Sequence, residues 1–143
     1  MKINTIVKKE LILFFTIGTI MFYLDYIGIK KVYNNCKDGY KTLFIHWLHH
    51  MCSSFLTFGW ISSNKTILKL HITTVSAVLL VQILNDGKCP ITDMINMNCN
   101  IKAETFLRDF LYFSGIKSSK HIYNYHIYRI SSIFISLYKL KNK

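Results

Sequence analysis

The 143-residue sequence has few charged residues, very little arginine and a single proline. Only 17% of its residues are charged, against about 25% in an ordinary soluble domain. Of its 18 basic residues, only Arg108 and Arg129 are arginine, the residue that nucleic-acid-binding proteins favour for phosphate and base contacts. The sequence therefore argues against a soluble domain and against nucleic acid as a partner.

The sequence also lacks the short motifs that mark common enzyme and metal sites. Its four cysteines form no Cys-x-x-Cys pair, so neither a zinc ribbon nor a thioredoxin-type redox site is supported. Walker, Gly-x-Ser-x-Gly and Gly-x-Gly-x-x-Gly motifs are absent as well. These absences favour a non-enzymatic role.

Apolar residues, in contrast, make up 51% of the chain and occur in long blocks. A helix needs about 20 apolar residues to cross a bilayer. Three blocks approach that length, at residues 11–29, 43–61 and 67–85, and a less apolar block covers 121–138. We expect the last block to span too, with an interfacial helix as the alternative. Residues 101–115 predict a short amphipathic helix along the membrane interface.

Together these blocks predict an all-α integral membrane helical bundle, with three to four transmembrane helices plus the short interfacial helix in one domain, residues 1–143. The net charge of +11 comes mostly from lysines that flank the apolar blocks, where they meet anionic headgroups. The expected partners are the lipid bilayer and other membrane proteins or a second copy of the chain. The usage of Ile, Lys, Asn, Tyr and Phe is typical of an AT-rich genome, such as that of a protist, an AT-rich bacterium or a large DNA virus.

The order of the blocks also divides residues between the two membrane sides. A short turn at 62–66 would return the third helix antiparallel to the second. We name the side of the N-terminus side B and the opposite side A. His71 is then expected at side B. Side A gathers Asp25, Cys36, His46, His49, His50, Asp86, Cys89, Cys99, His121 and His126.

Three histidines stand within five residues in the string "HWLHH". His46, His49 and His50 fall within a sector of roughly 100° on a helix, and two of them could share one metal ion. The string resembles one histidine box of the membrane fatty-acid desaturases and hydroxylases, which hold two irons with several such boxes. A b-type haem held by histidines of two helices is an alternative, with His121 and His126 as further ligands. The sequence favours a simpler interpretation, in which interfacial histidines bond to headgroups, water or carbonyl groups.

The third block carries a polar stripe. His71, Thr74, Gln82 and Asn85 fall on one helical face together with Val78. Polar residues in a membrane span normally face the bundle and form bonds across helices. The alternative is a polar pathway, which would make the protein a small channel or transporter.

The stretch "KCPITDMINMNC" follows the third block. Its residues Cys89, Pro90, Ile91 and Thr92, with the apolar helix ending in Gln-Ile-Leu before them, resemble an uncharacterised family of small multi-pass membrane proteins. That family carries Cys-Pro-Leu-Thr after a membrane helix, and the resemblance covers about residues 70–113. It implies a small helical bundle and no particular activity. If side A lies in an oxidising compartment, a Cys89–Cys99 or Cys36–Cys89 disulfide is expected.

The sequence thus favours a small multi-pass membrane protein with a structural or accessory role. A haem- or metal-binding redox protein and a small channel or transporter are the two alternatives.

Overall fold

The computed structural model describes residues 5–34, 36–87, 89–100 and 122–142. All regular structure in these residues is helical, which confirms the all-α fold class. The predicted interfacial helix at 101–115 and His121 lie outside the described residues. The elements are α1 (Thr5–Tyr33), α2 (Gly39–Phe58), the 3-10 turn η1 (Gly59–Ile61), α3 (Lys65–Leu84), α4 (Pro90–Cys99) and α6 (Ile122–Lys141).

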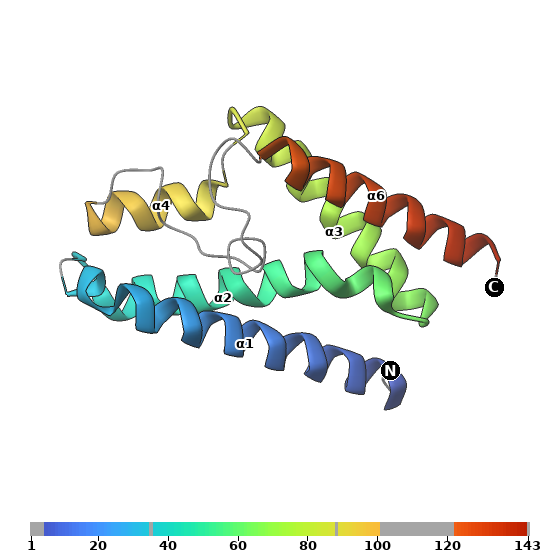
Figure 1. Cartoon of the computed structure of the whole chain (residues 1–143), viewed down its shortest axis with the longest axis horizontal. Coiled ribbons are helices and arrows are strands. Elements are labelled where there is room, and N and C mark those ends of the chain that lie inside the picture. Colours follow the sequence, from blue (N-terminus) through green and yellow to red (C-terminus); the bar gives the residue numbers. More distant parts are fainter. Residues whose placement is uncertain (1–4, 35, 88, 101–121, 143) are drawn as a thin grey trace.

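Two helix pairs form the fold (Figure 1). α1 lies along α2, α3 lies along α6, and the pairs meet near η1 and diverge away from it. Both chain ends lie at the η1 end of the molecule. α4 lies beside the N-terminal half of α2, where the Asn98 amide donates to the Thr42 hydroxyl at 2.8 Å.

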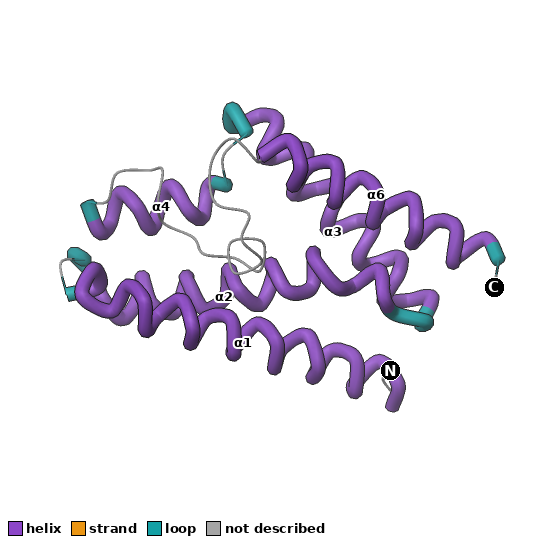
Figure 2. Tube along the Cα trace, in the orientation of Figure 1, coloured by secondary structure: helices purple, strands orange, loops and turns teal. Residues whose placement is uncertain are grey.

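A short turn joins α2 and η1 to α3 (Figure 2). Asn64 caps α3, because its side-chain oxygen accepts from the backbone N–H groups of Thr66 and Ile67 at 2.9 and 3.4 Å. α3 runs back from this turn, as predicted, but it diverges from α2 and lies along α6 instead.

A glycine allows α1 and α2 to approach closely. A Cβ atom on Gly18 would lie only 2.9 Å from the carbonyl oxygen of His50 and 2.9 Å from the Cα of Met51. One turn earlier on α1, the Phe14 carbonyl oxygen accepts a 2.7 Å hydrogen bond from the Ser54 hydroxyl of α2. The two backbones therefore touch directly along this part of the interface.

α4 is a helix that the sequence does not predict, because residues 86–100 are rich in turn-forming types. Asp86 and Gly87 have positive φ angles of 51° and 79° and turn the chain after α3. Pro90 then occupies the first turn of α4, where its missing N–H is no loss. The helix ends at Asn100, which adopts the left-handed conformation with φ of 53°.

Among the described residues, two helices are long and apolar enough to cross a membrane, at Val7–Ile27 within α1 and at Lys65–Leu84, which is α3. They coincide with the predicted spans 11–29 and 67–85. The predicted spans 43–61 and 121–138 coincide with α2 plus η1 and with α6. These two helices have 20 residues each but carry more polar side chains.

Candidate functional site

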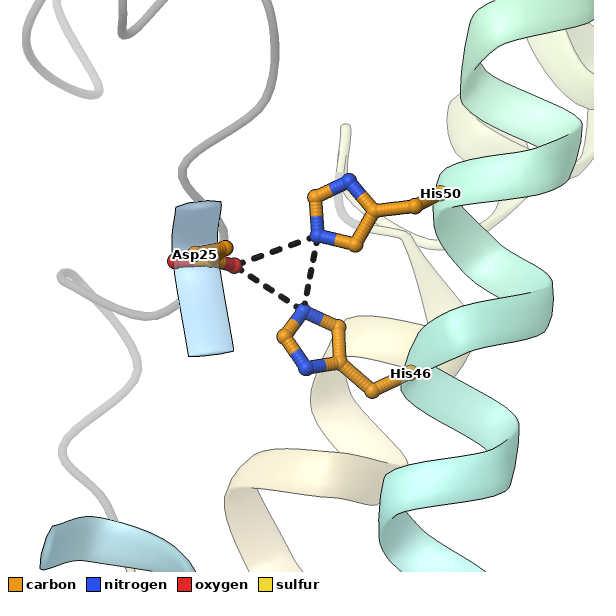
Figure 3. Close-up of side chains that lie close together, drawn as sticks. All are labelled: Asp25, His46 and His50. Carbon is orange, nitrogen blue, oxygen red and sulfur yellow. Dashed lines mark hydrogen bonds and ion pairs between the residues drawn. The ribbon is translucent and has the colours of Figure 1, made fainter. Parts of the chain in front are cut away.

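Three buried side chains meet between α1 and α2 (Figure 3). Asp25 belongs to α1, and His46 and His50 project from successive turns of α2. The Nε2 atoms of His46 and His50 lie 3.0 and 3.2 Å from Oδ2 of Asp25, and 3.0 Å from each other. None of the three residues is more than 1% exposed. One carboxylate oxygen and two imidazole nitrogens thus form a nearly equilateral triangle.

The contact between α1 and α2 brings this triangle together. Gly18, which allows the close approach, lies two turns before Asp25 on the same face of α1. Between them, Phe22 turns its ring toward the two imidazoles, with centroid distances of 5.5 Å to His46 and 6.1 Å to His50. An aromatic ring therefore covers part of the polar cluster.

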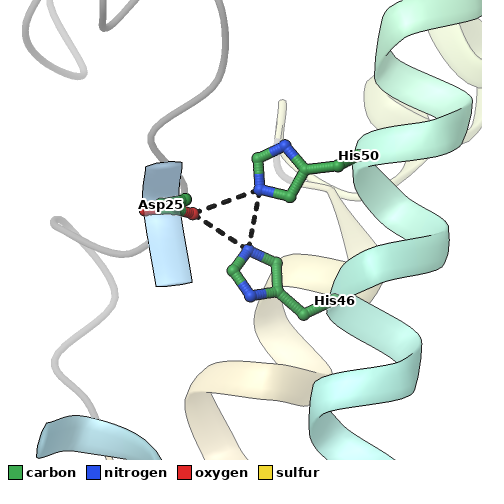
Figure 4. Close-up of polar contacts among 3 residues, drawn as sticks. All are labelled: Asp25, His46 and His50. Atoms are coloured by element: carbon green, nitrogen blue, oxygen red, sulfur yellow. Dashed lines mark hydrogen bonds and ion pairs between the residues drawn. The ribbon is translucent and has the colours of Figure 1, made fainter. Parts of the chain in front are cut away.

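The contacts of Asp25 are concentrated on one of its two oxygens (Figure 4). The other oxygen, Oδ1, is buried and has no hydrogen-bond partner among the described residues. A carboxylate removed from water is costly unless nearby groups compensate its charge. The cluster can do this by sharing protons or by holding a cation, and the potential ligand atoms of these three residues lie within 4.8 Å of one another.

The other predicted histidines lie elsewhere. His49 points toward α4, where its Nδ1 is 3.9 Å from the Cys89 sulfur. His126 belongs to α6, which packs against α3, and His121 is outside the described residues. Of the five histidines predicted as ligands, the structure therefore brings together His46 and His50.

Asp25 completes the cluster, whereas the sequence places it on side A near the end of its span, where it only weakly marks a site. The signal that could have identified it is its isolation. It is the one charged residue in the apolar block 11–29, and a charged residue within a membrane span usually has a partner in the bundle interior.

The polar stripe of α3 mainly joins this helix to its neighbours. The two ring nitrogens of His71 lie 3.1 Å from the Ser136 hydroxyl of α6 and 3.2 Å from the Leu56 carbonyl oxygen of α2. The Gln82 side-chain oxygen accepts a 2.6 Å hydrogen bond from Nη1 of Arg129 on α6, and both residues are buried. These contacts agree with the structural interpretation of the stripe.

The other two members of the stripe differ from each other. The Asn85 amide donates to Oδ2 of Asp93 on α4 at 3.2 Å, which links the end of α3 to the next helix. The Thr74 hydroxyl donates to the Leu70 carbonyl within α3 at 2.8 Å. Thr74 therefore makes no contribution of this kind to the joints between helices.

The structure corrects the predicted cysteine pairing, since the disulfide joins Cys36 to Cys99. The predicted Cys89–Cys99 bridge is wrong because α4 separates these residues by ten positions, or about 15 Å of helix. The predicted Cys36–Cys89 bridge is wrong because Cys36 is bonded to Cys99. Cys89 instead stands as a free thiol at the N-cap of α4, and Pro90, Ile91 and Thr92 form the first turn of that helix.

No known protein family, curated protein or solved structure matches this chain. The resemblance of its Cys-Pro-Ile-Thr segment to a family of small membrane proteins therefore stays a prediction. The part of the chain that the structure describes defines a class, an all-helical fold in which two helices are long and apolar enough to cross a membrane.

Proposed function

We propose that the chain is a small multi-pass integral membrane protein that serves as a structural or accessory component of its membrane. The observation that carries this proposal is the placement of polar and apolar side chains. Among the described residues, fourteen buried side chains are polar or charged and only seven are apolar. The core of a soluble protein has the opposite balance.

Large apolar side chains instead cover the outside of the helices. Only 17% of the most apolar stretch of α1 and 28% of that of α3 are buried, whereas the core helix of a soluble protein is mostly buried. Exposed apolar patches on soluble proteins are normally small. Here the exposed set on α1, α3 and α6 comprises Leu11, Ile12, Leu13, Phe15, Ile20, Tyr23, Leu24, Ile27, Leu70, Leu80, Val81, Ile83, Leu84, Ile127, Ile130, Phe134, Ile135, Leu137 and Tyr138.

The same placement supports spanning by α2 and α6, whose overall composition is less apolar. In α6, Arg129, Ser132 and Ser136 are buried, and the outward positions include Phe134 and Leu137. In α2, the buried residues are mostly histidine, serine and threonine. Because these polar groups face the bundle, they lower the mean hydropathy of each helix without being exposed to lipid.

Two details support a retained first helix and an orientation. α1 packs against α2 through Gly18 and supplies Asp25 to the buried cluster, which a cleaved signal segment would not do. The Cys36–Cys99 disulfide favours a lumenal or external side A, because disulfides persist in oxidising compartments. The lysines do not decide the orientation, because a spanning α6 adds Lys139, Lys141 and Lys143 to side B and offsets the excess of lysine on side A. We therefore rest the orientation on the disulfide.

The test combines fractionation with charge substitutions on the outer face. The wild-type chain should stay in the membrane pellet after extraction with alkaline carbonate. Ile20→Arg in α1 and Phe134→Arg in α6 replace residues that are 54% and 67% exposed. In a bilayer each arginine should cost about 2.5–3.5 kcal/mol near the helix centre and reduce membrane insertion.

The matched controls are Ile20→Leu and Phe134→Leu, which should insert like the wild type. Release of the wild type by carbonate would contradict the proposal. The proposal would also be contradicted if the two arginine variants folded normally and were at least as soluble as the wild type, since an exposed arginine does no harm on a soluble protein. If Ile20→Arg fails but Phe134→Arg inserts normally, α6 is not a span.

A further inference from the structure

The buried triangle of Asp25, His46 and His50 poses a problem of proton placement. Each imidazole Nε2 carries either one hydrogen or one lone pair, directed outward in the plane of the ring. At each corner of the triangle, the directions to the other two corners differ by about 60°, since the three edges measure 3.0, 3.2 and 3.0 Å. One N–H group can therefore point well at only one neighbour.

With the carboxylate ionised, no arrangement of protons makes all three contacts attractive. If both imidazoles donate to Oδ2 of Asp25, two Nε2 atoms that both carry hydrogen lie only 3.0 Å apart with no acceptor between them. If His50 alone carries the proton on Nε2, the lone pair of His46 faces the carboxylate oxygen at 3.0 Å. Such a mismatch in a site that excludes water is costly.

A cation between the three atoms removes the mismatch, because all three then direct a lone pair at one point. We propose that Asp25, His46 and His50 form a binding site for one divalent first-row transition-metal ion, with two imidazole nitrogens and one carboxylate oxygen as ligands. The proposal goes beyond a structural membrane role and does not depend on the number of spans.

The dimensions of the triangle suit such an ion. The point equidistant from the three atoms lies about 1.8 Å from each, and zinc–nitrogen and zinc–oxygen bonds measure about 2.0–2.2 Å. An ion at bonding distance would sit about 1 Å out of the plane of the three atoms. In a tetrahedral site the ligand atoms are roughly 3.3 Å apart, so the side chains need to separate by only a few tenths of an ångström.

The ligand types indicate the class of ion. Imidazole favours zinc, iron, copper and nickel, and a carboxylate adds affinity for harder ions such as manganese. Histidines four residues apart on a helix are a common spacing for two ligands of one ion. Zinc and ferrous iron are therefore the expected ions, and Co²⁺ serves as a coloured substitute for zinc. An ion with two positive charges would also compensate the buried carboxylate.

The same geometry excludes a bis-histidine haem held by His46 and His50 as a pair, and it does not bear on a haem held by histidines of two helices. The two axial ligands of a bis-histidine haem approach the iron from opposite faces of the porphyrin. His46 and His50 project from the same side of one helix with their Nε2 atoms 3.0 Å apart, which leaves no room for a macrocycle between them.

The direct test measures metal binding by the full chain, purified in detergent with a tag free of histidine. After loading with Zn²⁺, with Co²⁺ and with Fe²⁺ in separate samples and removal of excess metal, the wild type should retain one ion per chain. The cobalt-loaded protein should show visible d–d absorption of a low-coordinate site. Substituting residues that only position metal ligands typically lowers metal affinity about 10–100-fold. Removing a ligand itself should lower the affinity at least as much, so we expect a loss of about 100-fold or more in each of His46→Ala, His50→Ala and Asp25→Asn.

His49→Ala is the matched control, because His49 is adjacent in the same helix but turns toward Cys89. It should bind one ion with wild-type affinity. Lowering the pH should release the ion from wild type and control alike, since protonated imidazoles cannot coordinate.

Two outcomes would overturn the proposal. One is a folded wild type that retains neither Zn²⁺, Co²⁺ nor Fe²⁺ after loading, which would leave proton sharing as the role of the cluster. The other is equal loss of metal in His49→Ala and His46→Ala. Because the wild type itself supplies the first readout, a triangle variant that fails to fold does not remove the test.

Discussion

Replacing Gly18 by alanine should force α1 and α2 apart. The new methyl group would meet the terminal methyl of Met51 at 2.7 Å, the His50 carbonyl oxygen at 2.9 Å and the Met51 Cα at 2.9 Å. The Met51 methyl can move, but the other two atoms belong to the backbone of α2. To reach an ordinary contact distance of 3.4 Å, the helices must separate by about 0.5 Å at this point.

The sign of the effect distinguishes this packing from an open position. A glycine-to-alanine change within an exposed helix stabilises it by about 0.5–1 kcal/mol. Overpacking a tight contact costs about 1–3 kcal/mol. Because both terms act at Gly18, we expect a net loss of about 0–2.5 kcal/mol in the free energy of unfolding.

Unfolding by a denaturing detergent, followed by far-UV circular dichroism, would measure this loss. Ile20→Ala, at a position 54% exposed on the same helix, is the control for side-chain changes that leave the interface intact. Adding Met51→Ala to Gly18→Ala should restore little stability, since two of the three clashes are with backbone atoms. A Gly18→Ala protein more stable than the wild type, or full rescue by Met51→Ala, would refute the inferred backbone contact.

Two further predictions concern the joints between the other helices. Gln82→Leu should lower the free energy of unfolding by about 1–2 kcal/mol, because it removes the acceptor of a charge-assisted hydrogen bond from Arg129. In the same unfolding assay the control Thr74→Val should have little effect, since that hydroxyl bonds within α3. Equal effects of the two variants would argue against a stabilising contact between Gln82 and Arg129. Cys99→Ser should abolish the disulfide to Cys36 and lower the free energy of unfolding by about 2–4 kcal/mol. Non-reducing electrophoresis and the unfolding assay measure these two effects, and the control Cys89→Ser should keep the disulfide. Loss of the disulfide in Cys89→Ser would show the assigned pairing to be incorrect.

The cysteines show why expecting three of them close together did not give their pairing. The sequence places Cys36, Cys89 and Cys99 on one side of the membrane, and all three do lie near α2 or α4. Which two meet depends on whether residues 90–99 are extended or helical. Turn-forming residues around Pro90 obscured the helix, and the helix carries Cys99 back to the loop after α1.

The histidine cluster shows a similar limit. Helical periodicity places His46 and His50 on one face of α2, one turn apart, and this is a local property that the sequence fixes through a 3.6-residue repeat. In the same way, helical periodicity shows which face of α1 carries Asp25. That these two faces oppose each other depends on the rotation of α1 about its axis, which the contact at Gly18 sets.

The sequence by itself determined the helical class, the positions of four long helices and the short turn before α3, because the length of apolar blocks and the spacing of polar residues are local signals. Tertiary structure alone decided which helices pair, which cysteines join and which histidines meet a carboxylate. These outcomes depend on contacts between residues far apart in the chain, such as those of Asp25 with His46 and His50. Local periodicity carries no information about the rotation or pairing of helices, and so "HWLHH" reveals its partner only when α1 is packed against α2.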